Sequence, residues 1–457
     1  MAFNNVYFIG IGGIGMSALA RYFLHEGKAV AGYDRTPSPL TDDLQKEGAP
    51  VHFEDHVELI PAAFRDPADT LVIYTPAVPH DHAELNWFLA GGFTVEKRSR
   101  ALGHLSAGKF VMAVAGTHGK TTTTTLTAWL NHVAGGGGSA FLGGISKNFD
   151  SNLVLGAGDR LAVEADEYDR SFLQLSPDVA VITSTDADHL DIYGTVETMR
   201  EAFAQFAVQT RRAVIVKLGA KLNTDGLTAK VYRYAYDTPC DFYAANIALR
   251  EGGYYSFDLV TPGGIVADCT LGIPGWVNIE NAVAASALLW AAGQAPESGA
   301  AFDPEKLREA LRTFAGVKRR FEFYINTPQR VYMDDYAHHP TELHAAITSL
   351  RGMFPGREIT AVFQPHLYTR TRDFYKEFAQ ELSLADKVIL LPIYPAREEP
   401  IPGVDSQMIA RLVTVPCTIV AKEDIVDYLA GQQPDVAATF GAGDIDRYCA
   451  DIAKALK

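Results

Sequence analysis

Near residue 116 an apolar run, VMAVA, leads into the glycine-rich sequence GTHGKTT and then into a helical pattern. In loops of this kind backbone N–H groups surround phosphate oxygens, a lysine pairs with their charge and a hydroxyl binds magnesium. The usual spacing would put a glycine where Val114 stands, so the loop is a shortened variant. The sequence therefore predicts a phosphate-binding α/β unit, with Thr121 as a metal ligand. The predicted loop consists of Gly116, Thr117, His118, Gly119, Lys120, Thr121 and Thr122.

A second glycine cluster, GIGGIG, follows the first apolar run of the chain, and Asp34 stands 19 residues after its last glycine, Gly15. Glycines allow a close approach to a diphosphate, the helix N-terminus attracts it, and an acid at this distance holds a ribose hydroxyl. The pattern does not distinguish NAD from UDP, and a glycine turn without a ligand is the alternative. The alternation of strand and helix patterns around it predicts a doubly wound parallel sheet.

The length of 457 residues corresponds to two to four domains. We predict three α/β domains: a nucleotide-binding sheet in residues 1–103, a central P-loop ATPase-like domain in 104–318, and a dinucleotide-fold-like domain in 319–457. Residues 231–273 alternate aromatic and β-branched side chains and are expected to form antiparallel strands. The glycine run 135–138 is expected to form a mobile loop.

The net charge of −15 disfavours nucleic acid and anionic membranes as partners, and no basic block offsets it. It does not exclude a phosphate substrate, because distant charges are screened and a few local cations decide binding. The four cysteines form no CxxC pair, which fits a reducing cytosol and disfavours a zinc site. The apolar run 282–293 is too short to span a bilayer, and the N-terminus lacks signal-peptide features.

Two acidic segments follow the phosphate loop, each at the end of a predicted strand. EADEYD contains Glu164, Asp166, Glu167 and Asp169, and DHLD contains Asp188, His189 and Asp191. Ligands in open α/β sheets bind beyond the carboxyl ends of strands, and oxygen ligands there suit hard cations that bridge ATP oxygens. Solvated strand ends are the alternative for each segment alone; together they favour a metal site.

Cationic and imidazole side chains cluster in the last third of the chain. Arg319 and Arg320 are adjacent, so at most one is expected to face a phosphate while the other pairs with a surface acid. MDDYAHHPT and QPHLYTRTRD follow predicted strands and contain His338, His366 and Arg370. Arginine can hold a carboxylate through two parallel hydrogen bonds, so this region is a candidate substrate site.

Taken in order, GxGGxGM, GTHGKTTTT, EADExDxSFL, DHxDxYG, RRFE, DDYAHHPTE and FQPHxYTRTRD resemble the Mur ligases of peptidoglycan synthesis. The resemblance implies three domains that bind a UDP-sugar, ATP and an amino acid. It implies ATP-dependent formation of an amide between the lactyl carboxylate of UDP-N-acetylmuramate and L-alanine through an acyl phosphate, in the bacterial cytoplasm, with Mg²⁺ or Mn²⁺. Cell wall biogenesis, cell shape and cell division would depend on this step. We expect a monomer or a weak homodimer.

The resemblance also assigns residues by position. UDP-sugar binding falls to Gly10, Gly12, Gly13, Ile14, Gly15, Asp34, Thr75 and Ala77. ATP binding falls to the phosphate loop, Asn278, Asn281 and Arg320, the last near the γ-phosphate; the metal ligands are Thr121, Glu164 and His189. The incoming amino acid is assigned to Tyr336, His338, His366 and Arg370, and catalysis to Lys120, His189, Arg320 and His338. His338 is the candidate to assist the amine, since an unperturbed imidazole has a pKa near neutrality.

Two positions depart from the family pattern: Val277 stands where a histidine is common, and Leu367 where an arginine is common. The segment ETMREAFAQFAVQ contains no lysine, so no carbamylated lysine is expected, in agreement with the alanine-adding branch. Three other hypotheses stay open at this point. They are a recycling ligase that attaches a tripeptide to the same UDP-sugar, an NAD-dependent oxidoreductase, and a nucleotide-binding regulator without catalysis.

Overall fold

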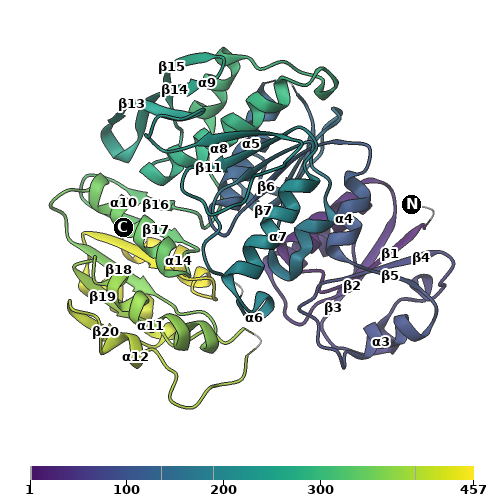
Figure 1. Ribbon diagram of the computed structural model, residues 1–457. Coiled ribbons are helices and arrows are strands. Elements are labelled where there is room, and N and C mark those ends of the chain that lie inside the picture. Colours follow the sequence, from purple (N-terminus) through teal and green to yellow (C-terminus); the bar gives the residue numbers. More distant parts are fainter. Residues whose placement is uncertain (1–2, 135, 189, 397) are drawn as a thin grey trace. The chain divides into compact units, whose positions relative to one another are not determined.

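A computed structural model describes residues 3–134, 136–188, 190–396 and 398–457 (Figure 1). The chain forms two compact units, and each is described by itself. The first comprises Met1–Tyr243, Val260–Val266 and Asn281–Leu311; the second comprises Ala244–Leu259, Ala267–Glu280 and Arg312–Lys457. None of the helices in the described ranges is long and apolar enough to cross a membrane.

The N-terminal sheet of the first unit is parallel, with the strand order β3-β2-β1-β4-β5. Alternate residues of β1 pack on opposite faces: Phe8 joins a core with α1 and α2, whereas Tyr7 and Ile9 join one with α3. The central position of β1 makes its carboxyl end the point where strand order reverses. The bounds are β1 (Asn5–Ile9), α1 (Ile14–His25), β2 (Ala29–Tyr33), α2 (Pro39–Lys46), β3 (Val51–His52), η1 (Val57–Leu59), η2 (Ala62–Phe64), β4 (Thr70–Tyr74), α3 (Ala83–Ala90), β5 (Thr94–Lys97) and α4 (Arg98–Ser106).

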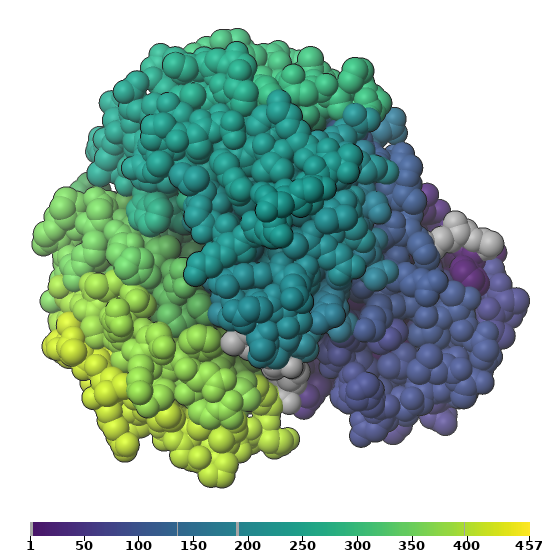
Figure 2. Space-filling view, in the orientation of Figure 1, coloured from purple at the N-terminus to yellow at the C-terminus, as the bar shows by residue number. Residues whose placement is uncertain are grey.

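The second sheet has the order β12-β11-β10-β6-β9-β7-β8, and of the pairs recorded only β7–β8 is antiparallel. Residues near the end of this sheet, around 200–240, are coloured teal in the space-filling view (Figure 2). Because β6 lies between β9 and β10, loops after all three strands meet at one edge. The bounds are β6 (Phe110–Ala115), α5 (Lys120–Val133), β7 (Ser139–Ser146), β8 (Ser151–Val154), β9 (Arg160–Glu164), η3 (Tyr168–Gln174), β10 (Val179–Ile182), α6 (Leu190–Tyr193), α7 (Val196–Gln209), β11 (Ala213–Lys217) and β12 (Lys230–Tyr234).

The strand β12 corrects one expectation, because it pairs in parallel with β11 as the edge of the second sheet. Its alternating burial fits an edge strand as well as a hairpin, so alternation alone could not decide its partner. The remaining strands of the region form a three-stranded sheet in the order β13-β14-β15. The bounds are β13 (Tyr243–Leu249), η4 (Glu251–Gly253), β14 (Tyr255–Thr261), β15 (Gly264–Thr270), α8 (Trp276–Gly293), η5 (Pro296–Ser298) and α9 (Pro304–Thr313).

The sheet of the second unit has the order β16-β17-β21-β18-β19-β20, antiparallel only at β16–β17. One face packs against α10, α11 and α12, and the other against α13 and α14. Three adjacent strands, β17, β21 and β18, therefore end at one edge. The bounds are β16 (Glu322–Asn326), β17 (Val331–Asp335), α10 (Pro340–Met353), β18 (Ile359–Phe363), α11 (Tyr368–Leu382), β19 (Lys387–Leu390), α12 (Gln407–Ala410), β20 (Cys417–Ile419), η6 (Lys422–Asp424), α13 (Ile425–Gln432), β21 (Val436–Phe440) and α14 (Asp446–Ala455).

The described part of the glycine run, residues 136–138, is closely packed, and its mobility stays a prediction. A Cβ at Gly138 would lie 2.0 Å from the carbonyl oxygen of Arg160, and one at Gly136 would lie 2.1 Å from Oδ1 of Asn131. Arg160 is buried, and its Nε donates to the carbonyl of Ser298 over 2.8 Å. The glycines therefore allow backbone segments to approach closely around a buried arginine.

Candidate active site

The phosphate loop connects β6 to α5, at the edge where β9 and β10 also end. Gly119 is the N-cap of α5 with φ +79°, and the first turn of the helix carries no acid. A helix N-terminus with exposed N–H groups and no acidic side chain attracts an anion. The geometry is therefore suited to the phosphate that the sequence predicted.

Two hydroxyl side chains after β10 support this loop, and the sequence analysis missed both. Ser184 Oγ accepts from His118 N over 2.8 Å and lies 2.7 Å from Thr117 Oγ1. A Cβ at Gly116 would lie 2.1 Å from Thr183 Oγ1, and Gly116 has φ +132°. Glycine is required there by the close approach of β10, a contact that no local sequence pattern reveals.

Lys120 turns back onto its own loop and meets an acid of the EADEYD segment. Its Nζ donates to the carbonyl of Gly116 over 2.7 Å and to Glu167 Oε1 over 2.8 Å. Burial opposes the charged form of Lys120, but the carboxylates of Glu167, Asp166 and Glu164 outweigh that effect and raise its pKa. Lys120 is therefore a cation at neutral pH.

Thr121 and Glu164 also meet at this edge, although 43 residues separate them. Thr121 Oγ1 donates to Glu164 Oε1 over 3.2 Å. A Cβ at Gly143 would lie 2.1 Å from Glu164 Oε2, so the carboxylate of Glu164 packs directly against the backbone of Gly143 in β7. His189, the third predicted metal ligand, lies outside the described residues.

A hydroxyl and a carboxylate at hydrogen-bond distance fit the oxygen ligands that Mg²⁺ prefers. Across residues 3–134, 136–188, 190–396 and 398–457, no group of three or more His, Cys, Asp and Glu side chains is placed to hold a metal. Thr121 and Glu164 therefore form a partial set of donors, which a substrate phosphate would extend.

The two asparagines predicted near adenine belong to different units. Asn281 lies beside the phosphate loop: its Oδ1 accepts from Thr123 Oγ1 over 3.3 Å and lies 2.9 Å from the position of a Cβ on Gly119. Asn278 is buried in the second unit, where its Nδ2 donates to the carbonyl of Pro274 over 2.7 Å. Asn281 is thus placed with the loop in the first unit.

A cavity of ≈ 250 Å³ in the first unit runs from the N-terminal glycine cluster to the acidic segment after β9. Arg98 is the one cation among the described residues that line it, and its Nη2 donates to Asp166 Oδ2 over 3.0 Å. Arg98 was not predicted from the sequence, because an arginine after a strand belongs to no recognisable motif. The lining residues are Gly13, Ile14, Gly15, Met16, Leu19, Thr75, Arg98, Leu102, Phe141, Leu142, Gly143, Glu164 and Asp166.

Two other residues predicted for the UDP-sugar take different positions. Asp34 braces the glycine cluster: its Oδ2 accepts from Gly12 N over 2.7 Å and its Oδ1 from Thr36 N over 3.2 Å. Ala77 is exposed beyond the end of β4. Gly10 has φ +86°, and a Cβ there would lie 2.5 Å from Thr75 Cγ2. The glycine cluster is therefore held between Asp34 and Thr75.

In the second unit the four residues assigned to the amino acid lie together with Arg320. The ring centroids of His338 and His366 are 6.0 Å apart, and Arg320 Cζ lies 4.8 Å from the ring centroid of Tyr336. Burial lowers the pKa of His338 to about 4; Glu342 opposes this effect, while Arg370 and Arg320 add to it. The pKa of His338 therefore lies well below that of the unperturbed imidazole, whose near-neutral pKa was the reason for making His338 the candidate to assist the amine.

The tautomer of His338 follows from its hydrogen bond, because Nδ1 lies 2.9 Å from the carbonyl of Tyr336 and must donate to it. Nε2 is then the unprotonated atom. Burial also raises the pKa of Asp335 to about 6, against the opposing charge of Arg320.

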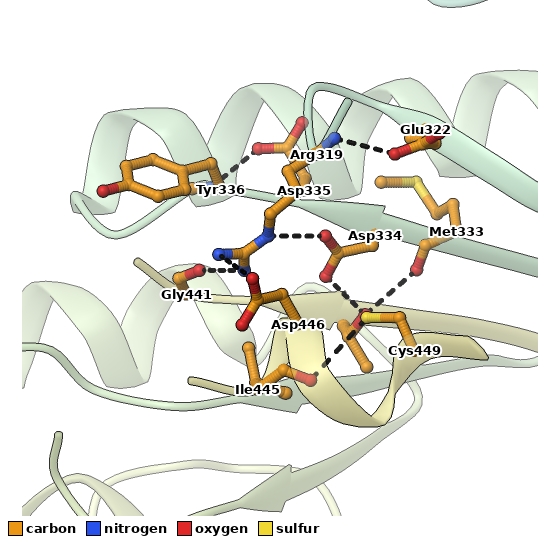
Figure 3. Close-up of polar contacts among 12 residues, drawn as sticks. Arg319, Glu322, Met333, Asp334, Asp335, Tyr336, Gly441, Ile445, Asp446 and Cys449 are labelled. Carbon is orange, nitrogen blue, oxygen red and sulfur yellow. Dashed lines mark hydrogen bonds and ion pairs between the residues drawn. The ribbon is translucent and has the colours of Figure 1, made fainter. Parts of the chain in front are cut away.

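Arg319 pairs with the fully buried Asp334 over 3.0 Å and also with the exposed Asp446 over 3.7 Å (Figure 3). The expected pairing with a surface acid is confirmed by the second contact, whereas the first was not predicted. Asp334 is the fourth residue of β17 and directly follows three apolar residues, so its position in the strand would usually hold a core side chain. The pair joins positions 15 residues apart.

Three family descriptions and several known proteins match this chain over most of its length. The descriptions "Mur ligase family, catalytic domain", "Mur ligase middle domain" and "Mur ligase, glutamate ligase domain" match residues 5–110, 114–289 and 319–443. A UDP-N-acetylmuramate–L-alanine ligase of Parabacteroides distasonis is 51% identical over 448 residues, covering 97% of this chain and 95% of the relative. The chain belongs to the Mur ligase family.

Other members of the Mur ligase family agree with this result. A UDP-N-acetylmuramate–L-alanine ligase of Flavobacterium johnsoniae is 44% identical, over 99% of this chain and 98% of the relative. The crystal structure of a UDP-N-acetylmuramate–alanine ligase from Thermotoga maritima matches with a TM-score of 0.81 and 26% identity, over 98% of both chains. A murein peptide ligase of Psychrobacter arcticus, at 21% identity and a TM-score of 0.71, shares the fold. The predicted three-domain α/β Mur ligase fold is confirmed; the boundaries at 103 and 318 stay predictions.

Proposed function

We propose that this Mur ligase uses ATP to join the lactyl carboxylate of UDP-N-acetylmuramate to the amine of L-alanine in peptidoglycan precursor synthesis. The observation that carries the proposal is the cavity of the first unit. It reaches from Gly13–Gly15 at the N-terminus of α1 to Glu164, which bonds Thr121 of the phosphate loop. A sugar nucleotide bound at the glycine cluster would present its acid end to an ATP phosphate. The full-length similarity to alanine ligases supports the choice of amine.

The chemistry requires two steps, because a carboxylate is a poor electrophile at neutral pH. The carboxylate oxygen attacks the γ-phosphorus of ATP, the bond to the β-phosphate oxygen breaks, and an acyl phosphate and ADP form. The amine of alanine then attacks the acyl carbon, phosphate departs with the C–O electron pair, and the amine loses its proton to solvent. Lys120 supplies positive charge at the phosphate loop, and Arg320 is assigned to the γ-phosphate. Positioning and electrostatics account for most of such a rate.

Thr121 and Glu164 would hold Mg²⁺, with His189 as a further ligand. The ion would neutralise charge on the phosphate oxygens. Thr121 and Glu164 already lie within 3.2 Å, so this part of the site needs little rearrangement. Manganese, with similar oxygen chemistry, is the expected substitute.

The charge of each residue assigned to alanine determines which part of the amino acid it would bind. Arg370 is assigned to the alanine carboxylate, since a guanidinium matches its two oxygens. Nε2 of His338 accepts a hydrogen bond from the amine and orients it. A pKa of about 4 makes His338 a weak base, so it positions the amine rather than storing its proton. Tyr336 and His366 complete the walls of this site.

Phosphate release tests the proposal directly. With ATP and Mg²⁺, turnover should require both UDP-N-acetylmuramate and L-alanine. Equal turnover with L-alanyl-γ-D-glutamyl-meso-diaminopimelate in place of alanine would move the assignment to the recycling ligase. Oxidation or reduction of a nicotinamide cofactor without ATP use would replace it with an oxidoreductase, and ATP binding without turnover would favour a regulator. Sedimentation of the same sample would test the expected monomer or weak homodimer.

A further inference from the structure

The segment before β16 is a tight turn whose backbone carries two unfavourable residues. Arg320 N donates to the carbonyl of Val317 over 3.2 Å, which closes the turn. Arg319 has φ +61° and Phe321 has φ +50°, and neither residue is a glycine or an asparagine. Side chains with a Cβ rarely adopt this conformation, so surrounding contacts must hold it in place.

The side chain of Arg319 supplies one set of those contacts (Figure 3). Its Nε donates to Asp334 Oδ2 over 3.0 Å, and Asp334 also accepts from Thr439 Oγ1 over 2.7 Å. Its Nη2 donates to the carbonyl of Gly441 over 2.7 Å, and its Nη1 donates to that of Gly443 over 3.3 Å. All three guanidinium nitrogens therefore have acceptors on the strands or loops at this edge of the sheet.

The backbone of Arg319 is fixed as well. Its N–H donates to Glu322 Oε2 over 2.8 Å, and its carbonyl accepts from Tyr336 N over 2.7 Å. The turn is thus joined to the residues that immediately follow β17, from which Tyr336 and His338 extend.

Phe321, the residue that follows Arg320, is held by Asp335, the residue that follows Asp334. Phe321 N donates to Asp335 Oδ2 over 2.7 Å, and the second oxygen of Asp335 accepts from Ala337 N over 2.7 Å. Successive residues of a strand point to opposite faces. Two consecutive carboxylates at the end of β17 therefore hold the residues that flank Arg320, one from each face.

Fixed neighbours on both sides determine the direction in which Arg320 leaves the backbone. Its Cζ lies 4.8 Å from the ring centroid of Tyr336, and Arg319 Cζ lies 5.2 Å from the same ring. We propose that Arg319, paired with the buried Asp334, is a positioning residue that aims Arg320 at the transferred phosphoryl group. This inference rests on the proposed function, in which Arg320 meets the γ-phosphate.

Replacing Arg319 by lysine separates positioning from charge. Lysine keeps the positive charge and the backbone preferences but presents one ammonium in place of a planar fork with three bonded nitrogens. We expect R319K to lower kcat about a hundredfold, the scale of an error of about 1 Å in placing a catalytic group. The KM for UDP-N-acetylmuramate should stay unchanged. R357K is the matched control, because Arg357 forms an ion pair with Asp435 in the same unit, away from the residues assigned to substrates. The kcat of R357K should equal that of the unchanged protein.

A double-mutant cycle with R320A distinguishes positioning from a general structural role. If Arg319 acts through Arg320, R319K should lower kcat no further in the R320A background, although it should lower Tm equally in both. Three results would each overturn the inference. R319K could lower kcat by the same factor in both backgrounds, R319K could leave kcat unchanged, or R320A could leave kcat unchanged. If R319K does not fold, D334N decides the question by the same cycle, since it removes the partner charge and keeps its shape. An unchanged protein that releases no phosphate with both substrates would instead overturn the proposed function.

Discussion

The ammonium of Lys120 lies 2.8 Å from the carboxylate of Glu167, a side chain with no exposed surface. The two residues are 47 positions apart, and the pair joins the phosphate loop to the segment after β9. Two buried charges in contact stabilise each other, whereas one left alone is costly. Loss of Lys120 therefore affects folding as well as catalysis.

We expect K120A to lose phosphate release and also about 3 kcal/mol of unfolding free energy, because Glu167 would remain buried and unpaired. The double variant K120A/E167Q should recover most of that stability and stay inactive. Urea unfolding and phosphate release on the three proteins would show this. Calorimetry should find UDP-N-acetylmuramate binding intact in the double variant, since the sugar nucleotide is assigned to the first sheet; its loss would contradict that division.

Arg98 and Lys97 bond two further acids of the same segment, Asp166 over 3.0 Å and Asp169 over 2.6 Å respectively. Since Arg98 lines the cavity beside Gly15, R98Q should weaken UDP-N-acetylmuramate binding about tenfold while changing the KM for ATP little; one partly buried charged hydrogen bond has this magnitude. Titration calorimetry measures both the variant and the control R100Q, whose side chain is 63% exposed. Equal affinities in R98Q and R100Q would exclude Arg98 as a substrate contact.

Gly143 should be intolerant of even one added methyl group, because a Cβ there would lie 2.1 Å from a carboxylate oxygen of Glu164. G143A is expected to displace Glu164 and raise the Mg²⁺ concentration needed for half-maximal turnover. G352A is the control, since a Cβ at Gly352 in α10 meets nothing within 4 Å. A magnesium requirement equal in the two variants would remove Glu164 from the set of metal ligands.

Arg370 is expected to bind the carboxylate of the incoming amino acid. R370A should therefore raise the KM for L-alanine far more than the KM for ATP, by about tenfold or more for a lost charge-assisted pair. R372A is the matched control on the same helix, because Arg372 is half-exposed and bonds its neighbour Asp373. Steady-state kinetics in each substrate would decide, and an equal rise in both constants would rule out this role.

A buried neutral network in the first sheet should make stability depend on pH. Tyr7 donates to Glu84 Oε2 over 2.8 Å, and Glu84 Oε1 lies 3.2 Å from His52 Nε2. Burial raises the pKa of Glu84 from 4.5 to about 7 and lowers that of His52, so Glu84 is protonated at mildly acid pH.

The pKa of Glu84 is higher in the folded state than in the unfolded state. Glu84 therefore adds to the free energy of unfolding below pH 4.5, and this contribution is lost as the pH rises toward 7. E84Q cannot titrate, so the difference in unfolding free energy between E84Q and the unchanged protein should shift in favour of E84Q over that range. Urea unfolding at several pH values measures the difference. A difference independent of pH between 4.5 and 7 would contradict a raised pKa for Glu84.

Sequence pattern was sufficient to predict the phosphate loop, the glycine cluster and the alternation of strands and helices. These features are local: the glycines, Lys120 and Thr121 are contiguous, and apolar runs mark each strand wherever it pairs. Local pattern could not predict which strands pair with each other. The alternation of β12, for example, fits a parallel edge strand as well as one strand of a hairpin.

The contacts between charged side chains depend on how distant segments pack and could not be predicted from the sequence. Glu167 reaches Lys120, Asp334 reaches Arg319, and Gly143 supports Glu164, all through strand order and register. The same packing buries His338 and lowers its pKa to about 4, where sequence alone allowed only the ordinary value. The physical reason is that periodicity specifies the type of an element, whereas the partner and the solvation of a side chain depend on residues distant in the chain.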